Sequence, residues 1–431
     1  MKKVLFLALT LVWATSIRAA GSDTPYMRNS LGSMLLVHEE DEFHPDIETA
    51  YLKIATPNKF NEHNVNTRLL YNSQMQVSGR RQTGLYKSEY GKSLMSSEIQ
   101  ANAAAILRAL EKDETAKKMV AKWFSLEGKT VNDAHFGVEL IQERGEYAAS
   151  DLDVRIAMHT LKGRSTLQDA GEQLIDHTFL IVNDITYVTA EQRAAAAKAA
   201  MSVLGALFNA RDIANAASTI ADAFTGFTVR THSYLYQLEW NDSVAAIFYD
   251  QYYTETPDPA KITAFLSDKT TFHLKYVAHE YEFAGKSELV GVTSRNDIIQ
   301  TQAARSIDRN IAALQRAYYP FRVRVPIFRI ITDLKGKSYY AVRIGQKEGL
   351  TPKSKFQVLL QQRDPETNKT VYKKVAIIKP ANKYIWDDRF NLYDEQSASQ
   401  DSTRQGLPAY TLFKKVSGSE IVPGMLIIQI K

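Results

Sequence analysis

TFLIV, at residues 178–182, and VRTHSYLYQLEW, at residues 229–240, are the two stretches that decide the fold of this chain. The first is a short run of mostly apolar residues, which is typical of a buried strand. The second alternates strictly between its two sides and therefore predicts another strand. One side of this second strand carries large residues throughout: Tyr234, Tyr236, Leu238 and Trp240.

A long helical connection is expected between these two strands. Thr189 and Gln192 form a capping box, which predicts the start of a helix, and the alanine-rich run 193–208 follows it. A second stretch, residues 213–224, keeps its apolar residues on one helical face. A strand, a helical crossover and a strand make the βαβ unit of α/β sheets. We therefore predict a central α/β module with a helical crossover.

Further periodic patterns extend this module over residues 97–319. Apolar residues spaced by three and four predict helices at residues 97–110, 116–124, 152–175 and 296–318. Additional strands are expected at residues 244–253 and 272–283. Residues 20–96 contain prolines, the acidic run 39–42 and only short β-like pieces, so we expect a partly irregular N-terminal arm there.

The pattern of the sequence changes after Pro320, because only short stretches with strand-like patterns follow. Glycine, proline and asparagine separate them at roughly regular spacing, which predicts a small β-barrel or sandwich over residues 320–431. The expected strands are residues 322–331, 339–344, 356–361, 371–379, 410–416 and 425–430. The predicted fold class is thus α+β or α/β, with an α/β module followed by a C-terminal all-β domain.

Four short motifs carry a resemblance to a known domain. They are YAVRIG at residues 340–345, EGL at 348–350, FQV at 356–358 and IVPGM at 421–425. In these motifs the C-terminal part resembles the SH3-like barrel of flagellar assembly protein T relatives, which implies an SH3-like barrel here. The central module resembles, in the order of its elements, the α/β domains of curli-assembly and TolB-like proteins. The chain also resembles an uncharacterised family of secreted Gram-negative envelope proteins, a likeness that implies no activity.

The N-terminus has the pattern of a secretory signal peptide. Lys2 and Lys3 precede the apolar stretch 4–14, and residues 16–19 offer a cleavage site before Ala20. This apolar stretch is shorter than the ~20 residues that a membrane-spanning helix needs. We therefore expect residues 1–19 to be a signal peptide and the mature chain to be exported without a transmembrane span. The expected location is periplasmic, extracellular or associated with the outer membrane of a Gram-negative bacterium.

Composition excludes several classes of chemistry. The chain has no cysteine, which rules out disulfides, thiol catalysis, iron–sulfur clusters and thiolate zinc sites. Its apolar content of 45% and charged content of 23% are those of a folded soluble protein rather than a disordered or multi-spanning one. The sequence predicts no cofactor.

Charge is divided unequally along the chain. Residues 20–300 carry 27 basic and 37 acidic residues, whereas residues 301–431 carry 23 basic and 11 acidic ones. Such an asymmetry favours attraction between the two parts or a partner with an acidic surface. Four arginines are candidates for contacting an acidic envelope polymer or protein: Arg305, Arg309, Arg322 and Arg324. Solvated faces that aid solubility are the alternative, and nucleic acid is not expected as a partner of an exported protein.

The aromatic side of the strand at residues 229–240 is a second candidate binding surface. Tyr234, Tyr236 and Trp240 have rings that can stack on sugars, although alternating aromatics beside an apolar residue more often form the core of a sheet. The core interpretation is favoured. Both interpretations remain open at this point.

No catalytic signature is present. The chain has no Gly-x-Ser-x-Gly nucleophile elbow, and its Gly-Lys-Ser triplets lack the earlier glycine of a phosphate-binding loop. His38 and His44 flank the acidic run, where a solvated arm is favoured over a cation site, while His273 and His279 are too far apart along one strand to share a metal. We therefore expect no metal site.

One carboxylate pair leaves an enzymatic alternative open. Glu280 and Glu282 point to one side of an expected strand about 7 Å apart, which falls within the range of glycosidases. The leading hypothesis is an exported, non-enzymatic envelope protein that acts as a binding or assembly component. The alternative is a hydrolase of envelope glycans or peptides that uses carboxylates.

Overall fold

The computed structural model describes two β-sheets, each with its own core. It describes residues 29–75, 96–148, 174–189, 224–289, 294–365, 370–381, 385–386 and 410–430, with single gaps at 58, 129 and 323. Helices and strands are both abundant, so the α+β prediction is confirmed. The signal-peptide segment and the alanine-rich run lie outside the described residues, as do residues 152–173 of another expected helix.

Six strands form the first sheet, in the order β2-β1-β4-β5-β6 with β3 also paired to β1. Their bounds are β1 Ser30–Val37, β2 Asn61–Glu62, β3 Leu69–Tyr71, β4 Thr178–Thr189, β5 Phe224–Leu238 and β6 Leu274–Leu289. β1 is parallel to β2, β3 and β4, whereas β5 is antiparallel to both of its neighbours. Part of the stretch expected to be an irregular arm is thus a central strand of the sheet.

The predicted βαβ unit is wrong in one respect, because β4 and β5 are antiparallel neighbours. Phe179 lies opposite Gln237 and Thr189 lies opposite Phe227, so one strand ends at the edge where the other begins. A βαβ crossover joins parallel strands and therefore has to return to the opposite edge of the sheet. In this sheet the last residue of β4, Thr189, and the first residues of β5 lie at the same end of the two strands.

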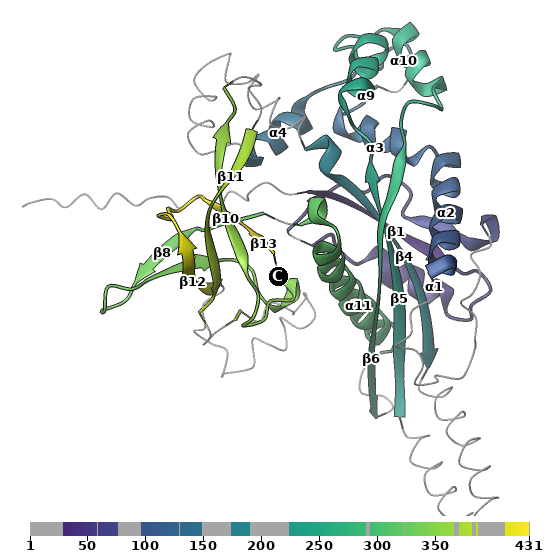
Figure 1. Cartoon of the computed structure of the whole chain (residues 1–431). Coiled ribbons are helices and arrows are strands. Elements are labelled where there is room, and N and C mark those ends of the chain that lie inside the picture. Colours follow the sequence, from purple (N-terminus) through teal and green to yellow (C-terminus); the bar gives the residue numbers. More distant parts are fainter. Residues whose placement is uncertain are drawn as a thin grey trace, which may run out of the picture.

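Helices cover both faces of this sheet (Figure 1). α1 (His44–Leu52) and α11 (Arg295–Ala317) pack on one face, where Ile299, Ile307 and Leu314 of α11 join the core with Leu35, Ile181 and Leu235 of the sheet. α2 (Ser96–Lys112) and α3 (Thr115–Trp123) pack on the other face. The remaining helices are α4 (Glu139–Ala148), α9 (Asp242–Ile247), α10 (Pro259–Ser267) and the π-helical turn η4 (Phe248–Tyr252). Short 3-10 turns are η1 (Asn72–Gln74), η3 (Ile175–His177), η5 (Tyr319–Phe321) and η6 (Gln346–Glu348).

The helices expected at residues 97–110, 116–124 and 296–318 are confirmed, but the strand expected at residues 244–253 is wrong. That segment forms α9 and η4. The side chain of Asn241 accepts hydrogen bonds from the backbone of Ser243 and Val244, which satisfies two free N–H groups at a helix start. Phe248 then packs within a large aromatic cluster. Helix capping and aromatic packing thus override a strand-like composition.

The second sheet has seven antiparallel strands, in the order β7-β13-β10-β11-β12-β9-β8. Their bounds are β7 Val325–Pro326, β8 Arg329–Thr332, β9 Ser338–Val342, β10 Phe356–Arg363, β11 Thr370–Pro380, β12 Thr411–Gly418 and β13 Leu426–Gln429. Its inner face buries a separate apolar core around Val358, Ile378, Phe413 and Ile427. All of these strands come from the predicted all-β region; the domain boundary at residue 320 stays a prediction.

This second sheet is curled, although the closed SH3-like barrel is not confirmed. β7 and β8 are the two ends of the pairing order, yet only Ile327 and Phe328 separate them. The N–H of Ile327 donates to the carbonyl of Met425 beside β13, and the N–H of Phe328 donates to Ala341 in β9. One short segment therefore contacts both ends of the sheet.

Two contacts link residues 59 and 60, beside the first sheet, to the turns η5 and η6. The rings of Phe60 and Phe321 stack with centroids 5.1 Å apart, and Lys59 lies 3.4 Å from the carboxylate of Glu348. No helix in the described part of the chain is long and apolar enough to span a membrane.

Candidate functional site

Three of the four arginines predicted to bind an acidic partner contact other parts of the chain. Arg305 and Arg309 lie on α11, where the Arg309 guanidinium donates to the carbonyl of Phe283 in β6. β6 ends the pairing order of the first sheet, so Arg309 satisfies a carbonyl of this end strand. Part of this charge therefore serves the fold.

Arg322 and Arg324 contact neighbouring segments of the chain. The guanidinium of Arg322 donates to the carbonyls of Gln315 and Arg316 in the last turn of α11, and to Gln429 at the end of β13. Arg324 lies over the ring of Tyr372, 4.2 Å from its centroid. Arg322 thus connects α11 to the second sheet through hydrogen bonds, and its guanidinium is not free to bind a ligand.

The aromatic surface predicted for sugar stacking is wrong, because its tyrosines are buried. Tyr234 and Tyr236 have no exposed surface: the hydroxyl of Tyr234 accepts from Asn102, and that of Tyr236 donates to the carbonyl of Ala103. Trp240 is half-buried and lies among the rings of the cluster that includes Phe248. These side chains form the core beneath α2, so the favoured core interpretation holds.

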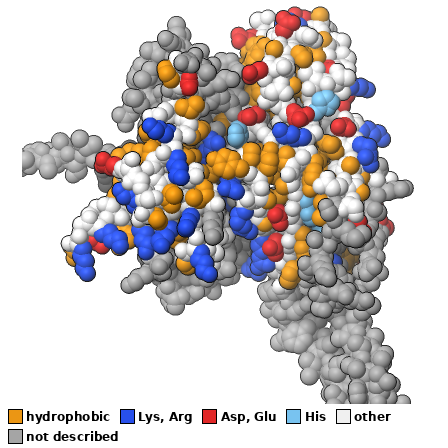
Figure 2. Space-filling model, in the orientation of Figure 1, with side chains coloured by type: hydrophobic (Ala, Val, Ile, Leu, Met, Phe, Trp, Pro, Cys, Tyr) orange, Lys and Arg blue, Asp and Glu red, His pale blue; other side chains and the backbone are white. Residues whose placement is uncertain are grey.

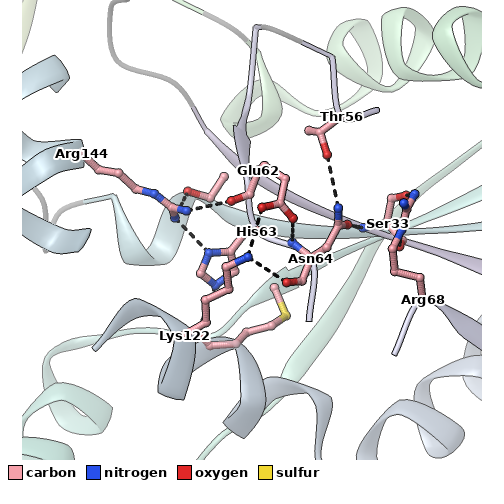
Figure 3. Close-up of polar contacts among 10 residues, drawn as sticks. Ser33, Thr56, Glu62, His63, Asn64, Arg68, Lys122 and Arg144 are labelled. Carbon is pink, nitrogen blue, oxygen red and sulfur yellow. Dashed lines mark hydrogen bonds and ion pairs between the residues drawn. The ribbon is translucent and has the colours of Figure 1, made fainter. Parts of the chain in front are cut away.

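A polar cluster lies where β2 and β3 leave a gap along β1 (Figure 3). The backbone N–H of Ser33 has no strand partner on that side and donates to the side chain of Asn64 at 2.8 Å. Arg68 approaches the Ser33 hydroxyl at 3.2 Å. The loop passes so close that a Cβ atom at Gly32 would lie 2.8 Å from the carbonyl oxygen of His63. Side chains of the loop thus replace missing ladder bonds.

A buried cation lies at the centre of this cluster. Arg144, on α4, is 4% exposed, and its guanidinium donates to Ser30, to Nδ1 of His63 and to the carbonyl of Glu62 at 2.8–2.9 Å. The guanidinium also lies over the Trp123 ring, 4.3 Å from its centroid. Burial lowers the pKa of Arg144 to about 10, with the acids Glu143 and Glu62 opposing that effect.

His63 is held neutral by this arrangement. Its Nε2 donates to the carbonyl of Met119, so its Nδ1 is the acceptor for Arg144. Burial first, and the nearby Arg144 charge second, lower the pKa of His63 well below its usual value of 6.5. A buried cation surrounded by neutral acceptors is a structural element, and it offers no group to a substrate.

Two further histidines have partners inside the fold. His38 was expected in a solvated arm, but it is buried, and its Nε2 lies 2.8 Å from Asp184. His279 pairs with His232 on the neighbouring strand, with ring nitrogens 3.0 Å apart. Within the described residues no group of three or more histidine or acidic side chains is arranged to hold a metal ion.

The carboxylates of the enzymatic alternative share one face of β6. Glu280 lies opposite Ser233 and Glu282 lies opposite Thr231, which places both on the side of α11. Burial raises the pKa of Glu280, while the charge of Arg316 acts in the opposite direction. Nothing further about these residues favours catalysis, so the hydrolase alternative stays a prediction.

A basic strip follows the outer face of the second sheet. Lys379 on β11 lies directly opposite Lys414 on β12. On its other side β12 pairs with β9, where Phe413 lies opposite Tyr340. This register places Lys414 beside Tyr339. Lys337 lies over the Tyr339 ring, 5.7 Å from its centroid. We define the basic strip as Arg329, Lys337, Tyr339, Lys379 and Lys414.

The cations of this strip are not neutralised within the described structure. No described carboxylate lies within ion-pair distance of Arg329, Lys337, Lys379 or Lys414. Figure 2 shows Lys and Arg side chains in a band along the second sheet. Other exposed lysines of the same region are Lys335, Lys353, Lys355, Lys373, Lys374 and Lys415. This surface is the best candidate for a functional site, and it carries part of the basic charge of the C-terminal part.

The sequence located this charge without identifying the strip. Lys379 and Lys414 are far apart in the chain, and only strand pairing brings them together. The alternation of Leu412 and Lys414 around buried Phe413 is the signal that would have placed Lys414 on the outer face. No protein-family model matches the chain, and no curated protein matches it either.

Proposed function

We propose that this protein is an exported, non-enzymatic binding or assembly component of the cell envelope, and that its basic strip contacts an anionic partner. The paired lysines Lys379 and Lys414 carry this proposal. Like charges placed directly opposite each other on a sheet destabilise it. A strip that keeps such a pair without a carboxylate gains stability when an anion lies across it.

The shape of the strip supports the same proposal. Arg329, Lys379 and Lys414 lie on paired strands of one curled sheet, and Lys337 lies in the hydrogen-bonded turn before β9, so their backbone positions are fixed before a partner arrives. Tyr339 adds a ring among the cations. A fixed array of charges loses little conformational freedom on binding compared with a flexible basic tail. Export is supported by the signal-peptide pattern of residues 1–19.

Co-sedimentation of the full mature chain with purified cell-wall material tests this function. The matched variants are K379Q/K414Q, which removes the two paired charges of the strip, and K53Q/K269Q, which removes the charges of two exposed lysines outside the second sheet. We expect the wild type and the K53Q/K269Q variant to sediment at low salt, and the strip variant to remain in the supernatant. Sedimentation should weaken as salt rises, because the Debye length falls from ~10 Å at 0.1 M to ~3 Å at 1 M. Equal sedimentation of all three proteins would contradict the proposal.

A further inference from the structure

We infer that the anionic partner is a lipid surface, and that the tip of the β8–β9 hairpin inserts Leu334 into it. This inference rests on the proposed function and names its ligand class. The hairpin tip, residues 333–337, projects away from the first sheet and its helices (Figure 1). Leu334 is 108% exposed at this tip, more than any other large apolar residue that is described.

The hairpin tip is a preformed turn. The carboxylate of Asp333 accepts from the backbone N–H groups of Lys335 and Lys337, and the N–H of Gly336 donates to the carbonyl of Asp333. Gly336 has a φ of +74°, a conformation that glycine adopts without strain. These bonds hold the Asp333 charge against the turn and leave the leucine as the outermost apolar group. The tip therefore needs little ordering when it docks.

Lysines lie in the same turn as this apolar group and at the same end of the sheet. Lys335 and Lys337 lie in the turn itself, and Lys414 and Lys415 of β12 lie at the same end of the sheet, because β12 runs antiparallel to β9. Val416 follows them and is 49% exposed. The end of the sheet thus combines two exposed apolar side chains with four lysines.

This combination fits a bilayer better than a dissolved polyanion. A hydrophilic polymer offers anions but no apolar environment, so it leaves Leu334 in water. The boundary of a bilayer offers both, because lipid headgroups meet the lysines and the acyl region takes the leucine. Each lysine near an anionic surface adds about fivefold to affinity, and burying one leucine adds about tenfold.

Flotation of the full mature chain with vesicles tests the inference. One set of vesicles is phosphatidylcholine alone and the other contains a minority of phosphatidylglycerol. The variants are L334N at the tip, K335Q/K337Q beside it, and L266N as a control at a partly exposed leucine of α10, away from the tip. We expect binding only to the anionic vesicles, a loss of about tenfold for L334N that persists at high salt, and a larger loss for K335Q/K337Q that disappears there. The L266N control should bind like the wild type.

A reporter variant measures insertion directly. L334W should show a blue shift of tryptophan emission with anionic vesicles and none with phosphatidylcholine. The inference is overturned if L334N binds anionic vesicles as well as the wild type, or if the reporter emission does not shift. A wild type that binds dextran sulfate and cell-wall material but no vesicles overturns the lipid inference and leaves the proposed function standing. A protein that binds none of these removes both.

Discussion

The guanidinium of Arg144 donates a hydrogen bond to Nδ1 of His63 at 2.9 Å, and both side chains are buried. The imidazole is therefore the acceptor in this bond and has its proton on Nε2. A second proton on the ring would face a fixed positive charge. This relationship gives the fold a defined dependence on pH.

Stability should fall as the pH falls below 6.5. His63 has a lowered pKa in the folded chain, so below pH 6.5 the unfolded chain binds a proton there that the folded chain does not. The contribution is fully present above pH 6.5 and is lost at up to ~1.4 kcal/mol per pH unit below it. Urea denaturation measures the free energy of unfolding of the wild type and of H63N. The two pH values, 7.5 and 5.5, lie about one unit above and below the usual histidine pKa of 6.5. An H63N variant with the same pH slope as the wild type would contradict this account.

Removing Arg144 should destabilise the fold strongly. R144M leaves the Ser30 hydroxyl, His63 Nδ1 and the Glu62 carbonyl without their donor, at a cost of ~3 kcal/mol or more in the free energy of unfolding. K122M is the matched control, because Lys122 pairs with Glu62 at the partly exposed rim of the same cluster and should cost only ~0–1 kcal/mol. Denaturant midpoints measure both. Equal midpoints for the two variants would show that Arg144 is not the centre of the cluster.

Arg322 should matter for stability rather than for binding. R322M removes donors to three carbonyls, at Gln315, Arg316 and Gln429, and should lower the free energy of unfolding by ~2 kcal/mol or more. Its binding to cell-wall material should stay near that of the wild type at a temperature where it remains folded. Lost binding by a folded R322M variant would return this arginine to the list of ligand-contacting residues.

The fold shows which of its features the sequence could predict. The helix α11 was predictable because its apolar residues repeat at helical spacing from Ile299 to Leu314. The direction of β4 relative to β5 was not, because a buried strand has the same apolar pattern whether its neighbour is parallel or antiparallel. Residues 244–253 were expected to form a strand, but Asn241 caps a helix just before them.

The candidate site was predictable only as a region. The charge distribution places the basic excess after residue 300, but the sequence pattern singles out only four arginines along one helix and one strand. Arg322 has neighbouring carbonyls as partners, which no linear pattern reveals. The pairing of Lys379 with Lys414 depends on the register between β11 and β12, and that register is fixed by packing of the sheet.

The paired lysines predict opposite effects on stability and on binding. K414E replaces a repulsive cross-strand pair with an attractive one, which should raise the free energy of unfolding by ~0.2–1 kcal/mol. The same change should weaken binding of an anion. Thermal unfolding of the free protein measures the effect on stability, with K269E as a control at an exposed position outside the second sheet. A K414E variant that is less stable than the wild type would mean that Lys414 has a structural role.

The titration of dextran sulfate into the full mature chain at low salt tests the central claim most directly. The comparison is between the wild type, the strip variant K379E/K414E and the control variant K53E/K269E, which has the same net charge as the strip variant. We predict that the strip variant loses about tenfold or more in affinity while the control stays close to the wild type. If both variants lose affinity equally, net charge alone drives binding and the basic strip is not the site.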